Sequence, residues 1–491
     1  MSEPACDVIL RNGMVVDGSG RPAFAADVAI RGDRLVRIGD LEHAKTLREI
    51  NVSGLIVAPG FIDVHTHDDA AVIARPEMTA KLTQGVTTVI GGNCGISGAP
   101  YSVPGDPPNL LRLVFKSDRF VAATFEEYLQ KVSAATPAIN AGFLTGHTTL
   151  RMQVMGGDLD RPASESEILE MQNLLIQCLK SGSLGLSTGL FYPPARAAST
   201  HEVTEIARPL NAYQGVYATH MRDEADNVME SLQETLQLGR TIGAPVIVSH
   251  HKCMGRANFG RTVQTLALLQ EARKHQAVAL DVYPYTAGSS VLNEELVSKS
   301  SRTMITWCDP HPEYCARDLS DVAREWGCTP LEAIPKLLPA GAVYFMMDEA
   351  DVTRIMRSPE AMIGSDGLPE DQHPHPRLWG TFPRVLGQYV REQNVLTLED
   401  AVHRMTGLSA DRFGLFNRGR VQEGHYADLC VFDLHTVRDT ATYEQPVQPA
   451  IGIYYVFVNG ELALERGTPT ATRAGRILRR GEQPVVRTRS H

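Results

Sequence analysis

Short apolar runs recur through the middle of the chain, and each of them ends in polar residues. Eight such runs carry His, Cys, Ser, Asp or Tyr near their C-terminal ends: 61–67, 85–95, 140–147, 182–190, 216–224, 245–252, 279–285 and 362–367. Runs of this length are typical of buried parallel strands. Amphipathic segments at 126–132, 165–179 and 228–243 predict helices between several of them. The alternation favours an α/β fold, a (β/α)8 TIM-like barrel; an open doubly wound sheet is the alternative.

The position of the polar residues predicts where a functional site lies. In a barrel of parallel strands, the carboxyl ends of the strands line one mouth, where active sites are built. The segment 285–344 is too long for a bare loop of the barrel and predicts an inserted small subdomain over that mouth.

Both ends of the chain have a different texture, with short Val- and Ile-rich runs separated by turn residues. Residues 8–13, 15–20 and 27–40 show it near the N-terminus, and 427–433 and 454–464 repeat it near the C-terminus. This pattern predicts hairpins in a sheet module that both ends share. We therefore expect three parts: 1–58 and 415–491 as the two pieces of a small β-sandwich, and 59–414 as the barrel.

Composition excludes several classes of function. The 491 residues carry a formal net charge of −10, which disfavours nucleic acid and anionic membranes as partners. No run is long enough to span a membrane, the N-terminus has no basic and apolar leader pattern, and the eight cysteines are irregularly spaced. We expect a cytoplasmic protein that acts on a small molecule; the sequence leaves the oligomeric state open, a monomer included.

Histidines and one cysteine at the strand ends predict a metal site. His65 and His67 are two residues apart after a strand, so both imidazoles point the same way. His220 and His250 each follow a strand, and their spacing fits successive strand–helix units. Cys94 lies among glycines in GGNCG, where a thiolate would be a soft, anionic zinc ligand; a nucleophilic cysteine is the alternative. Together they favour zinc ligation over isolated structural histidines.

Asp366 ends the last predicted strand. In a closed barrel the last strand pairs with the first, so this carboxylate is expected beside His65 and His67. We expect Asp366 to accept a proton from a zinc-activated water and to return it to the departing amine. A helix N-cap is the structural alternative.

These residues together resemble the amidohydrolase superfamily, and within it the N-acyl-D-amino-acid deacylases, or D-aminoacylases. The resemblance covers nearly the full chain and rests on these motifs: APGFIDVHTHDD, GVTTVIGGNCGIS, STGLFYPPA, YATHMRDE, SHHKCMG, YFMMDE, IGSDGLP and PHPRLWGTFPR. It implies a barrel, a β-sandwich from both termini and an inserted subdomain. It also implies a tightly held zinc on Cys94, His220 and His250, and a second, weaker metal position on His65 and His67.

The resemblance also implies how a substrate is bound. A free amino-acid product carries a carboxylate, for which Arg377 is the expected partner, with Tyr283 and Ser289 as the family's hydrogen-bonding groups. Phe191, Tyr344 and Met347 match positions that line an apolar side-chain pocket, which favours D-Leu, D-Met or D-Phe. Two cations, Lys252 and Arg302, leave open an acidic D-side chain such as D-Glu, and Ser298 stands where a larger apolar residue is expected. His147, His373 and His375 are further candidates for the border of the site.

The sequence therefore predicts zinc-dependent hydrolysis of N-acyl-D-amino acids, with Asp366 as general base and acid and His67 as a donor to the tetrahedral oxyanion. A cyclic-amide hydrolase is the rival among enzymes, although the lysine that usually bridges two metals there is missing from 182–190. A non-catalytic metal-binding scaffold is the rival from another class.

Overall fold

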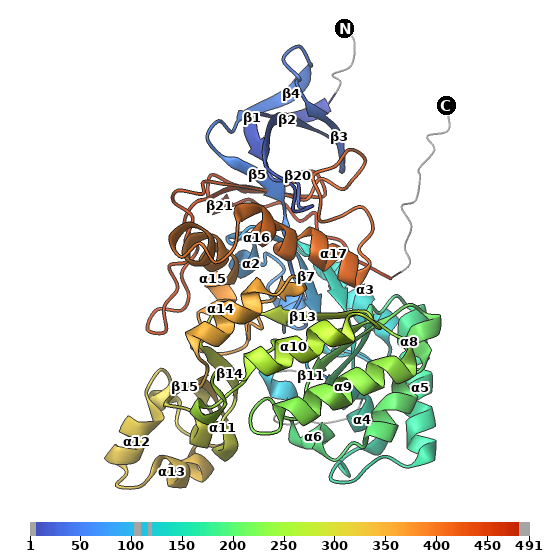
Figure 1. The fold of residues 1–491 in the computed structure, drawn as a ribbon, viewed down its shortest axis with the longest axis vertical. Coiled ribbons are helices and arrows are strands. Elements are labelled where there is room, and N and C mark those ends of the chain that lie inside the picture. Colours follow the sequence, from blue (N-terminus) through green and yellow to red (C-terminus); the bar gives the residue numbers. More distant parts are fainter. Residues whose placement is uncertain (1–5, 103–109, 116–119, 481–491) are drawn as a thin grey trace.

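The computed structural model describes residues 6–102, 110–115 and 120–480. Residues 1–5 and 481–491 lie outside this range. The expectation about the N-terminal leader rests in part on residues 1–5. Within it, no helix has the length and apolar character needed to cross a membrane. Figure 1 shows the terminal strands at one end, the parallel strands with their helices in the middle, and a small lobe beside them at the other end.

Parallel strands form the centre of the molecule, and every predicted run contains one. Their bounds are β6 (Phe61–Asp63), β7 (Val86–Gly91), β8 (Asn140–Phe143), β9 (Thr145–Gly146), β10 (Gly185–Gly189), β11 (Val216–His220), β12 (Val246–Val248), β13 (Val278–Val282) and β17 (Ala361–Ile363). They pair in the orders β6-β7-β8 and β9-β10-β11-β12-β13-β17. Since β8 runs into β9 after one residue, and Thr66 bridges Gly367 beyond β6 and β17, these pairings follow the order that a closed eight-stranded barrel requires.

Helices cover the outside of these strands. The three predicted helices are confirmed as α3 (Phe125–Ala135), α5 (Glu165–Lys180) and α9 (Val228–Ile242). Thr124 and Ser164 cap the first two with capping boxes, which satisfy the free N–H groups of the first turn. Further helices are α4 (His147–Met155), α7 (Thr200–Ala207), α10 (Thr262–Ala272), α14 (Glu349–Arg357), α15 (Arg377–Arg384), α16 (Leu398–Met405) and α17 (Gly407–Phe413).

The segment after β13 forms the small lobe. Strands β14 (Ala287–Val291), β15 (Arg302–Cys308) and β16 (Ala340–Phe345) make an antiparallel sheet in the order β14-β16-β15. The short helices α11 (Glu294–Lys299), α12 (Leu319–Glu325) and α13 (Pro330–Leu337) pack with it. Its residues share an apolar cluster with Cys94, Phe191 and Tyr283, so the lobe contacts the end of the parallel strands where the polar residues lie.

The two termini share one sheet, as the sequence predicted. The strands are β1 (Cys6–Val15), β2 (Phe24–Arg31), β3 (Arg34–Gly39), β4 (Thr46–Asn51), β5 (Ile56–Pro59), β18 (Leu429–Phe432), β19 (Ile453–Val458), β20 (Glu461–Glu465) and β21 (Thr468–Pro469). β5 pairs antiparallel with β18, and Asn459 and Gly460 form the predicted tight turn. Hydrogen bonds join all nine strands in one sheet, so the two-layer sandwich stays a prediction.

The predicted run 8–13 ends in Asn12 and Gly13, but these turn-forming residues do not reverse the chain. The chain continues through β1, and the extra residues form a bulge between Leu10 and Gly13. A Cβ on Gly13 would lie 2.7 Å from a methyl of Val57. This glycine therefore serves close strand packing rather than a reversal.

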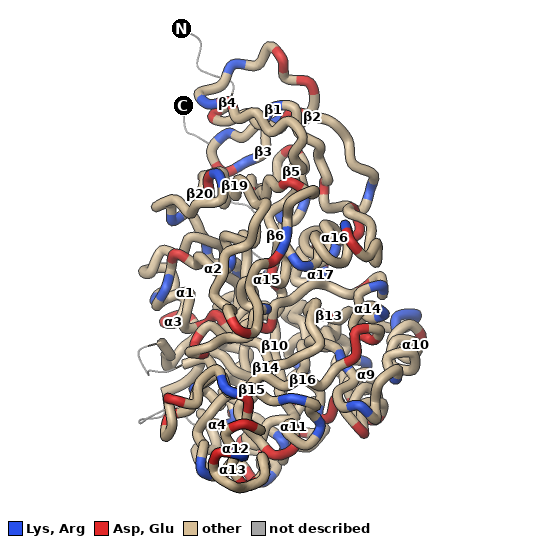
Figure 2. Tube along the Cα trace, turned by 90° about the vertical axis from the view of Figure 1, so that its left-hand side faces the viewer, with Lys and Arg blue, Asp and Glu red and all other residues tan. Residues whose placement is uncertain are grey.

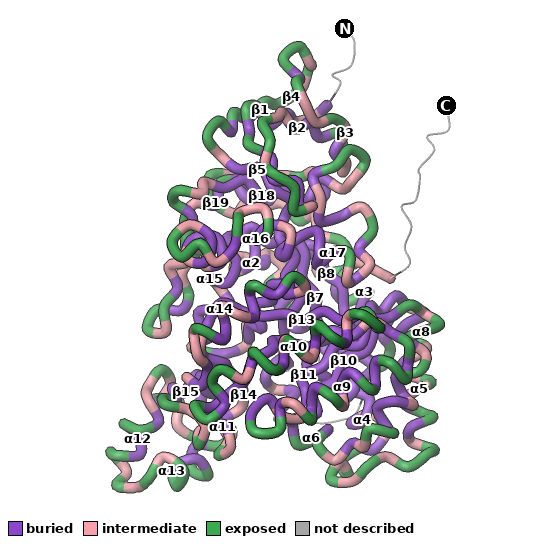
Figure 3. Tube along the Cα trace, viewed as in Figure 1, coloured by how far each residue is buried: buried purple, intermediate pink, exposed green. Residues whose placement is uncertain are grey.

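Burial follows this arrangement. In Figure 3 the central strands are buried, and exposed segments lie on the helices and the terminal loops. Acidic and basic residues are intermixed along the face in Figure 2. The strand ends stand out because their polar side chains are buried too: His65, Asp69, His147 and Asp281 are at most 2% exposed. Buried polar groups need partners, so a functional site is expected at this end of the parallel strands.

Candidate metal centre and substrate cavity

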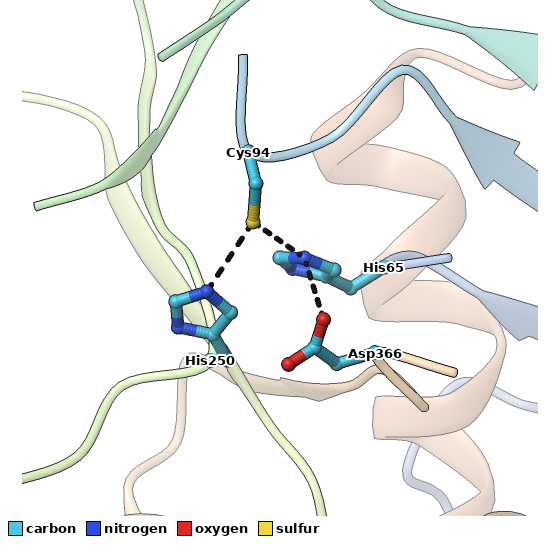
Figure 4. Close-up of side chains that lie close together, drawn as sticks. All are labelled: His65, Cys94, His250 and Asp366. Carbon is cyan, nitrogen blue, oxygen red and sulfur yellow. Dashed lines mark hydrogen bonds and ion pairs between the residues drawn. The ribbon is translucent and has the colours of Figure 1, made fainter. Parts of the chain in front are cut away.

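Four potential ligands converge from four strand ends. His65 follows β6, Cys94 follows β7, His250 follows β12 and Asp366 follows β17, and their ligand atoms all lie within 4.8 Å of one another. Cys94 Sγ is 3.3 Å from His65 Nε2 and 3.4 Å from His250 Nε2. Figure 4 shows these side chains pointing toward a common centre. A thiolate, two imidazoles and a carboxylate form a donor set suited to zinc.

The backbone is unusual at three of these residues. Cys94, His250 and Asp366 have φ angles of +52°, +33° and +50°, a region that L-residues rarely adopt and that costs conformational energy. The nearby Gly92 lets the chain pass close to its neighbour, because a Cβ there would lie 2.2 Å from the carbonyl oxygen of Leu144. The chain therefore bends sharply after the strands and turns these side chains inward.

The charges around Cys94 favour its thiolate form. Burial by itself would raise the pKa of the thiol, but the imidazolium charges of His65 and His250, whose own pKa values are raised, outweigh burial and hold the thiol pKa well below its usual value. Burial lowers the pKa of His220, so this imidazole is neutral. A thiolate and a neutral imidazole are the protonation states that a metal ligand requires.

His220 and His67 complete the cluster. His220 ends β11, stacks on Phe191 with ring centroids 5.6 Å apart, and approaches His250 with centroids at 4.5 Å. His67 Nε2 lies 3.1 Å from Asp366 Oδ1. Among the described residues, Nδ1 of His220 and Nδ1 of His67 are buried and have no hydrogen-bond partner. Buried nitrogens without partners are costly in a protein alone, and a metal ion would satisfy them.

Two buried carboxylates stand behind the histidines, and the sequence analysis did not select either. Asp281 lies 3.2 Å from His65 Nδ1 and also accepts the His250 backbone N–H. Glu224 lies 3.1 Å from His250 Nδ1. Two sequence signals could have identified them. Asp281 is a polar residue inside the apolar run 279–285, and Glu224 is an acidic residue four positions after His220. Carboxylates in such positions orient metal-binding imidazoles.

A small cavity of about 30 Å³ lies beside this cluster. Its wall includes these predicted site residues: Phe191, His220, His250, Lys252, Tyr283, Ser289, Tyr344 and Asp366. Tyr192, Glu224, Met254, Leu296 and Met346 line it as well. The cavity thus combines the metal cluster at one side with mostly apolar and aromatic residues of the small lobe at the other, an arrangement typical of small-molecule sites.

Arg377 is fully buried and lies against Asp366 and Tyr283, two residues of the cavity wall. Its Nη1 is 2.8 Å from Asp366 Oδ2, and its guanidinium stacks over the Tyr283 ring at 4.6 Å. Its Nη2 donates to the Ser289 carbonyl oxygen at 3.5 Å. Burial raises the pKa of Asp366, but Arg377, His65 and the other neighbouring imidazoles lower it by more, so the carboxylate is ionised.

Several residues considered in the sequence lie elsewhere. Met347 lines a smaller, separate cavity and accepts a 3.9 Å contact from the Tyr283 hydroxyl. Ser298 is exposed, because α11 turns Leu296 toward the cavity and Ser298, two residues on, away from it. Arg302 is exposed and paired with Asp318 at 2.8 Å.

The three remaining histidines have structural contacts. His147 Nε2 pairs with Glu202 at 3.1 Å, His373 Nε2 contacts the Tyr443 carbonyl oxygen, and His375 Nε2 contacts the Ala287 carbonyl oxygen. None of the three lines the cavity described above. Their bonds tie loops together around the site.

Comparison with known proteins gives the class of this chain. The model of the amidohydrolase family matches residues 48–286 and 328–463, so the chain belongs to that family. A hydantoinase structure from Arthrobacter aurescens, 16% identical with a TM-score of 0.60 over 97% of this chain and 100% of its own, shares the fold.

More similar relatives place the chain within the family. It is 51% identical to a D-aminoacylase, 46% to an N-acyl-D-aspartate deacylase and 44% to an N-acyl-D-glutamate deacylase, all from Alcaligenes xylosoxydans xylosoxydans; the matches cover 96–97% of this chain and 95–98% of each relative. A D-aminoacylase crystal structure superposes with a TM-score of 0.94 at 52% identity over 97% of this chain and 100% of its own. An N-acyl-D-glutamate deacylase from Bordetella bronchiseptica, complexed with zinc and a phosphonate inhibitor, gives 0.94 at 43% over 96% and 99%. This chain is an enzyme of the D-aminoacylase family.

Proposed function

We propose that this enzyme hydrolyses N-acyl-D-amino acids to a carboxylate and a free D-amino acid in a zinc-dependent reaction. The observation that carries the proposal is the position of Asp366. One of its carboxylate oxygens contacts His67, the other contacts Arg377, and the side chain lines the cavity. A general base between a metal cluster and a cation for the substrate is what deacylation of an amino acid needs.

The residues present fit a zinc site. Cys94, His220 and His250 would hold a first, tightly bound ion, and His65 and His67 would form a second, weaker position. The thiolate character of Cys94 and the unpartnered nitrogen of His220 support this division. Zinc supplies Lewis-acid chemistry, because it polarises a carbonyl oxygen and lowers the pKa of water.

Asp366 and His67 would move the protons. Asp366 accepts a proton at Oδ1 or Oδ2 from the attacking water and delivers it to the nitrogen of the leaving D-amino acid. His67 lies 3.1 Å from that carboxylate and donates a hydrogen bond to the oxyanion of the tetrahedral intermediate. Arg377 keeps Asp366 ionised between turnovers.

The α-carboxylate of the substrate would bind to Arg377, Tyr283 and Ser289, and Lys252 stands in the same wall as a further cation for a substrate carboxylate. The Tyr283 and Ser289 side chains line the same cavity as Lys252, and the Arg377 guanidinium lies against Tyr283. A planar guanidinium can hold a carboxylate with two parallel hydrogen bonds.

The side chain of the substrate would be apolar, such as D-Leu, D-Met or D-Phe. Phe191 and Tyr344 line the cavity together with Met254, Leu296 and Met346, whereas Arg302 lies outside it on Asp318. Met347 would support Tyr283 through the contact between its sulfur and the Tyr283 hydroxyl. An acidic preference, as in the N-acyl-D-glutamate deacylase, is the second candidate and rests on Lys252, whose ammonium is already paired with Glu224 at 2.7 Å.

We extend the proposal to the architecture. The parallel strands form a closed (β/α)8 barrel over 59–414 with an inserted subdomain at 285–344. Residues 1–58 and 415–491 fold as the two parts of a β-sandwich, and the protein acts in the cytoplasm. The strand pairings and the shared apolar cluster of β1, β5, β18 and β19 support this division.

A substrate panel tests the function. Zinc-supplied enzyme is assayed with the N-acetyl derivatives of D-Leu, D-Met, D-Phe, D-Asp, D-Glu and L-Leu. We expect turnover of the D-series, with the apolar members first. A preference for N-acetyl-L-Leu would contradict the proposal, and a preference for D-Glu or D-Asp would replace the apolar assignment by the acidic one.

A further inference from the structure

Glu224 is a buried carboxylate that has no role in the reaction steps proposed above. It follows β11 by four residues and is 1% exposed. One carboxylate contacts three basic groups: Lys252 Nζ at 2.7 Å, His250 Nδ1 at 3.1 Å and His220 Nε2 at 3.4 Å. Two of these belong to the metal cluster and the third belongs to the substrate cavity. Glu224 is therefore the point where both halves of the site meet.

The contacts of His250 make the role of Glu224 specific. Its Nε2 faces Cys94 Sγ, whereas its Nδ1 faces both Lys252 Nζ, at 2.8 Å, and Glu224. A lysine ammonium can only donate, so a bond from Lys252 to Nδ1 would leave the imidazole proton on Nε2. A carboxylate can only accept, so a bond from Nδ1–H to Glu224 leaves the Nε2 lone pair free toward Cys94. Only the second arrangement suits a metal ligand.

Lys252 needs the same carboxylate. Its side chain is buried, and its ammonium lies against one imidazole of the cluster. A buried ammonium without a counterion is costly, and it would repel a cation held by Cys94 and His250. Pairing with Glu224 at 2.7 Å removes that repulsion and keeps Lys252 in the wall of the cavity.

We propose that Glu224 is a positioning residue that couples metal binding to substrate binding: it accepts the Nδ1–H of His250, which directs Nε2 toward the metal, and it anchors Lys252 for the substrate carboxylate. This inference rests on the proposed function for the role of Lys252, but its metal half does not depend on which substrate is used.

The test compares Glu224→Gln with a matched control, Glu202→Gln. Glu202 is equally buried and also bridges a histidine, His147, and a cation, Arg151, away from the metal cluster. Zinc affinity of the metal-free proteins is measured by competition with a chromophoric chelator, beside thermal unfolding. We expect Glu224→Gln to lower zinc affinity by roughly 10–100-fold and Glu202→Gln to leave it unchanged at a similar loss of Tm. Equal zinc affinities would overturn the proposal.

A double-mutant cycle with Lys252→Met separates positioning from direct ligation. If Glu224 acts by neutralising Lys252 beside His250, then Lys252→Met in the Glu224→Gln background recovers much of the lost zinc affinity. Complete loss of zinc binding without recovery would instead make Glu224 a ligand and contradict the positioning role.

Kinetics of the zinc-saturated Glu224→Gln enzyme test the other half. The KM for N-acetyl-D-leucine should rise about tenfold or more, with a smaller fall in kcat, and an unchanged KM would refute the link to Lys252. If the wild-type protein hydrolyses no N-acyl-D-amino acid, the proposed function fails, while the zinc affinities still decide the metal half of this inference.

Discussion

The two halves of the site are built in different ways. The metal half uses residues at the ends of β6, β7, β11, β12 and β17, which the parallel pairing brings to one mouth. The substrate half takes much of its wall from β14, α11 and β16 in the small lobe. Strand ends are held by hydrogen bonds on both sides, whereas the lobe residues depend on the phase of a short helix and the register of a small sheet.

This difference predicts separable effects of mutation. Changes in the metal half should remove catalysis altogether, because metal and general base act on every substrate. Changes in the lobe should alter which substrate is preferred and leave the chemistry intact. The relatives compared above are named for different N-acyl-D-amino acids, as a constant metal half beside a variable pocket would allow.

The largest effect is expected for Cys94→Ala. It removes the anionic ligand and leaves His65 and His250 without the sulfur at 3.3 and 3.4 Å. We expect loss of tightly bound zinc and of measurable turnover. Cys178→Ala is the control, since that thiol is buried and its pKa is raised to about 12 by burial; it should lower Tm and keep zinc. Full zinc content in Cys94→Ala would mean that Cys94 is not a zinc ligand.

Asp366→Asn should follow, with kcat lower by about 10²–10⁴-fold. The amide keeps the size of the side chain but cannot accept the proton. Asp428→Asn is the matched control, because Asp428 is a buried partner of an arginine, Arg418, in the terminal sheet. Both variants should unfold at lower temperature, and only Asp366→Asn should lose kcat. Substantial turnover with zinc bound would refute the role of Asp366.

Arg377→Lys tests the carboxylate site on the border between the halves. Lysine keeps the positive charge but cannot form the two parallel hydrogen bonds of a guanidinium. The KM for N-acetyl-D-leucine should therefore rise by about 10–100-fold with a smaller change in kcat. Arg384 offers a control, since it also stacks on a tyrosine, Tyr285, and pairs with an aspartate, Asp439. Arg384→Lys should leave KM unchanged; equal effects of the two variants would count against substrate binding by Arg377.

The smallest effect is expected in the lobe. Leu296→Arg places a cation in the cavity wall, whereas Ser298→Arg places one on the exposed side of the same helix. We expect the ratio of kcat/KM for N-acetyl-D-glutamate over N-acetyl-D-leucine to rise about tenfold in the first variant and to stay constant in the second. A larger shift from Ser298→Arg would mean that α11 is turned differently when substrate binds.

The same contrast explains what could be predicted from the sequence. Each parallel strand was predicted because a buried parallel strand is a continuous apolar run. The meeting of the polar residues after these strands was predicted from the expected order of the strands. Glu224 and Asp281 were missed, since most of their partners, such as His250 for Glu224 and His65 for Asp281, are nitrogens of residues far along the chain. Acidic residues after or inside apolar runs are too common to single out.

The lobe and the backbone bends were less predictable. Nothing in the sequence sets the phase of α11, so Ser298 rather than Leu296 was expected at the cavity. The positive φ angles of Cys94 and Asp366 depend on contacts that surround them, and L-residues show no local preference for them. The glycine at position 13 predicted a turn, although the chain uses it to fit against Val57.

The most direct test of the account is a zinc titration of metal-stripped enzyme. Protein freed of metal by a chelator is returned to zinc in steps of a fraction of an equivalent, and hydrolysis of N-acetyl-D-leucine is followed together with bound zinc. We predict no activity without metal and a rise that is complete when the tight site on Cys94, His220 and His250 is filled. Turnover by the metal-free protein, or full zinc occupancy without turnover of any N-acyl-D-amino acid, would contradict it.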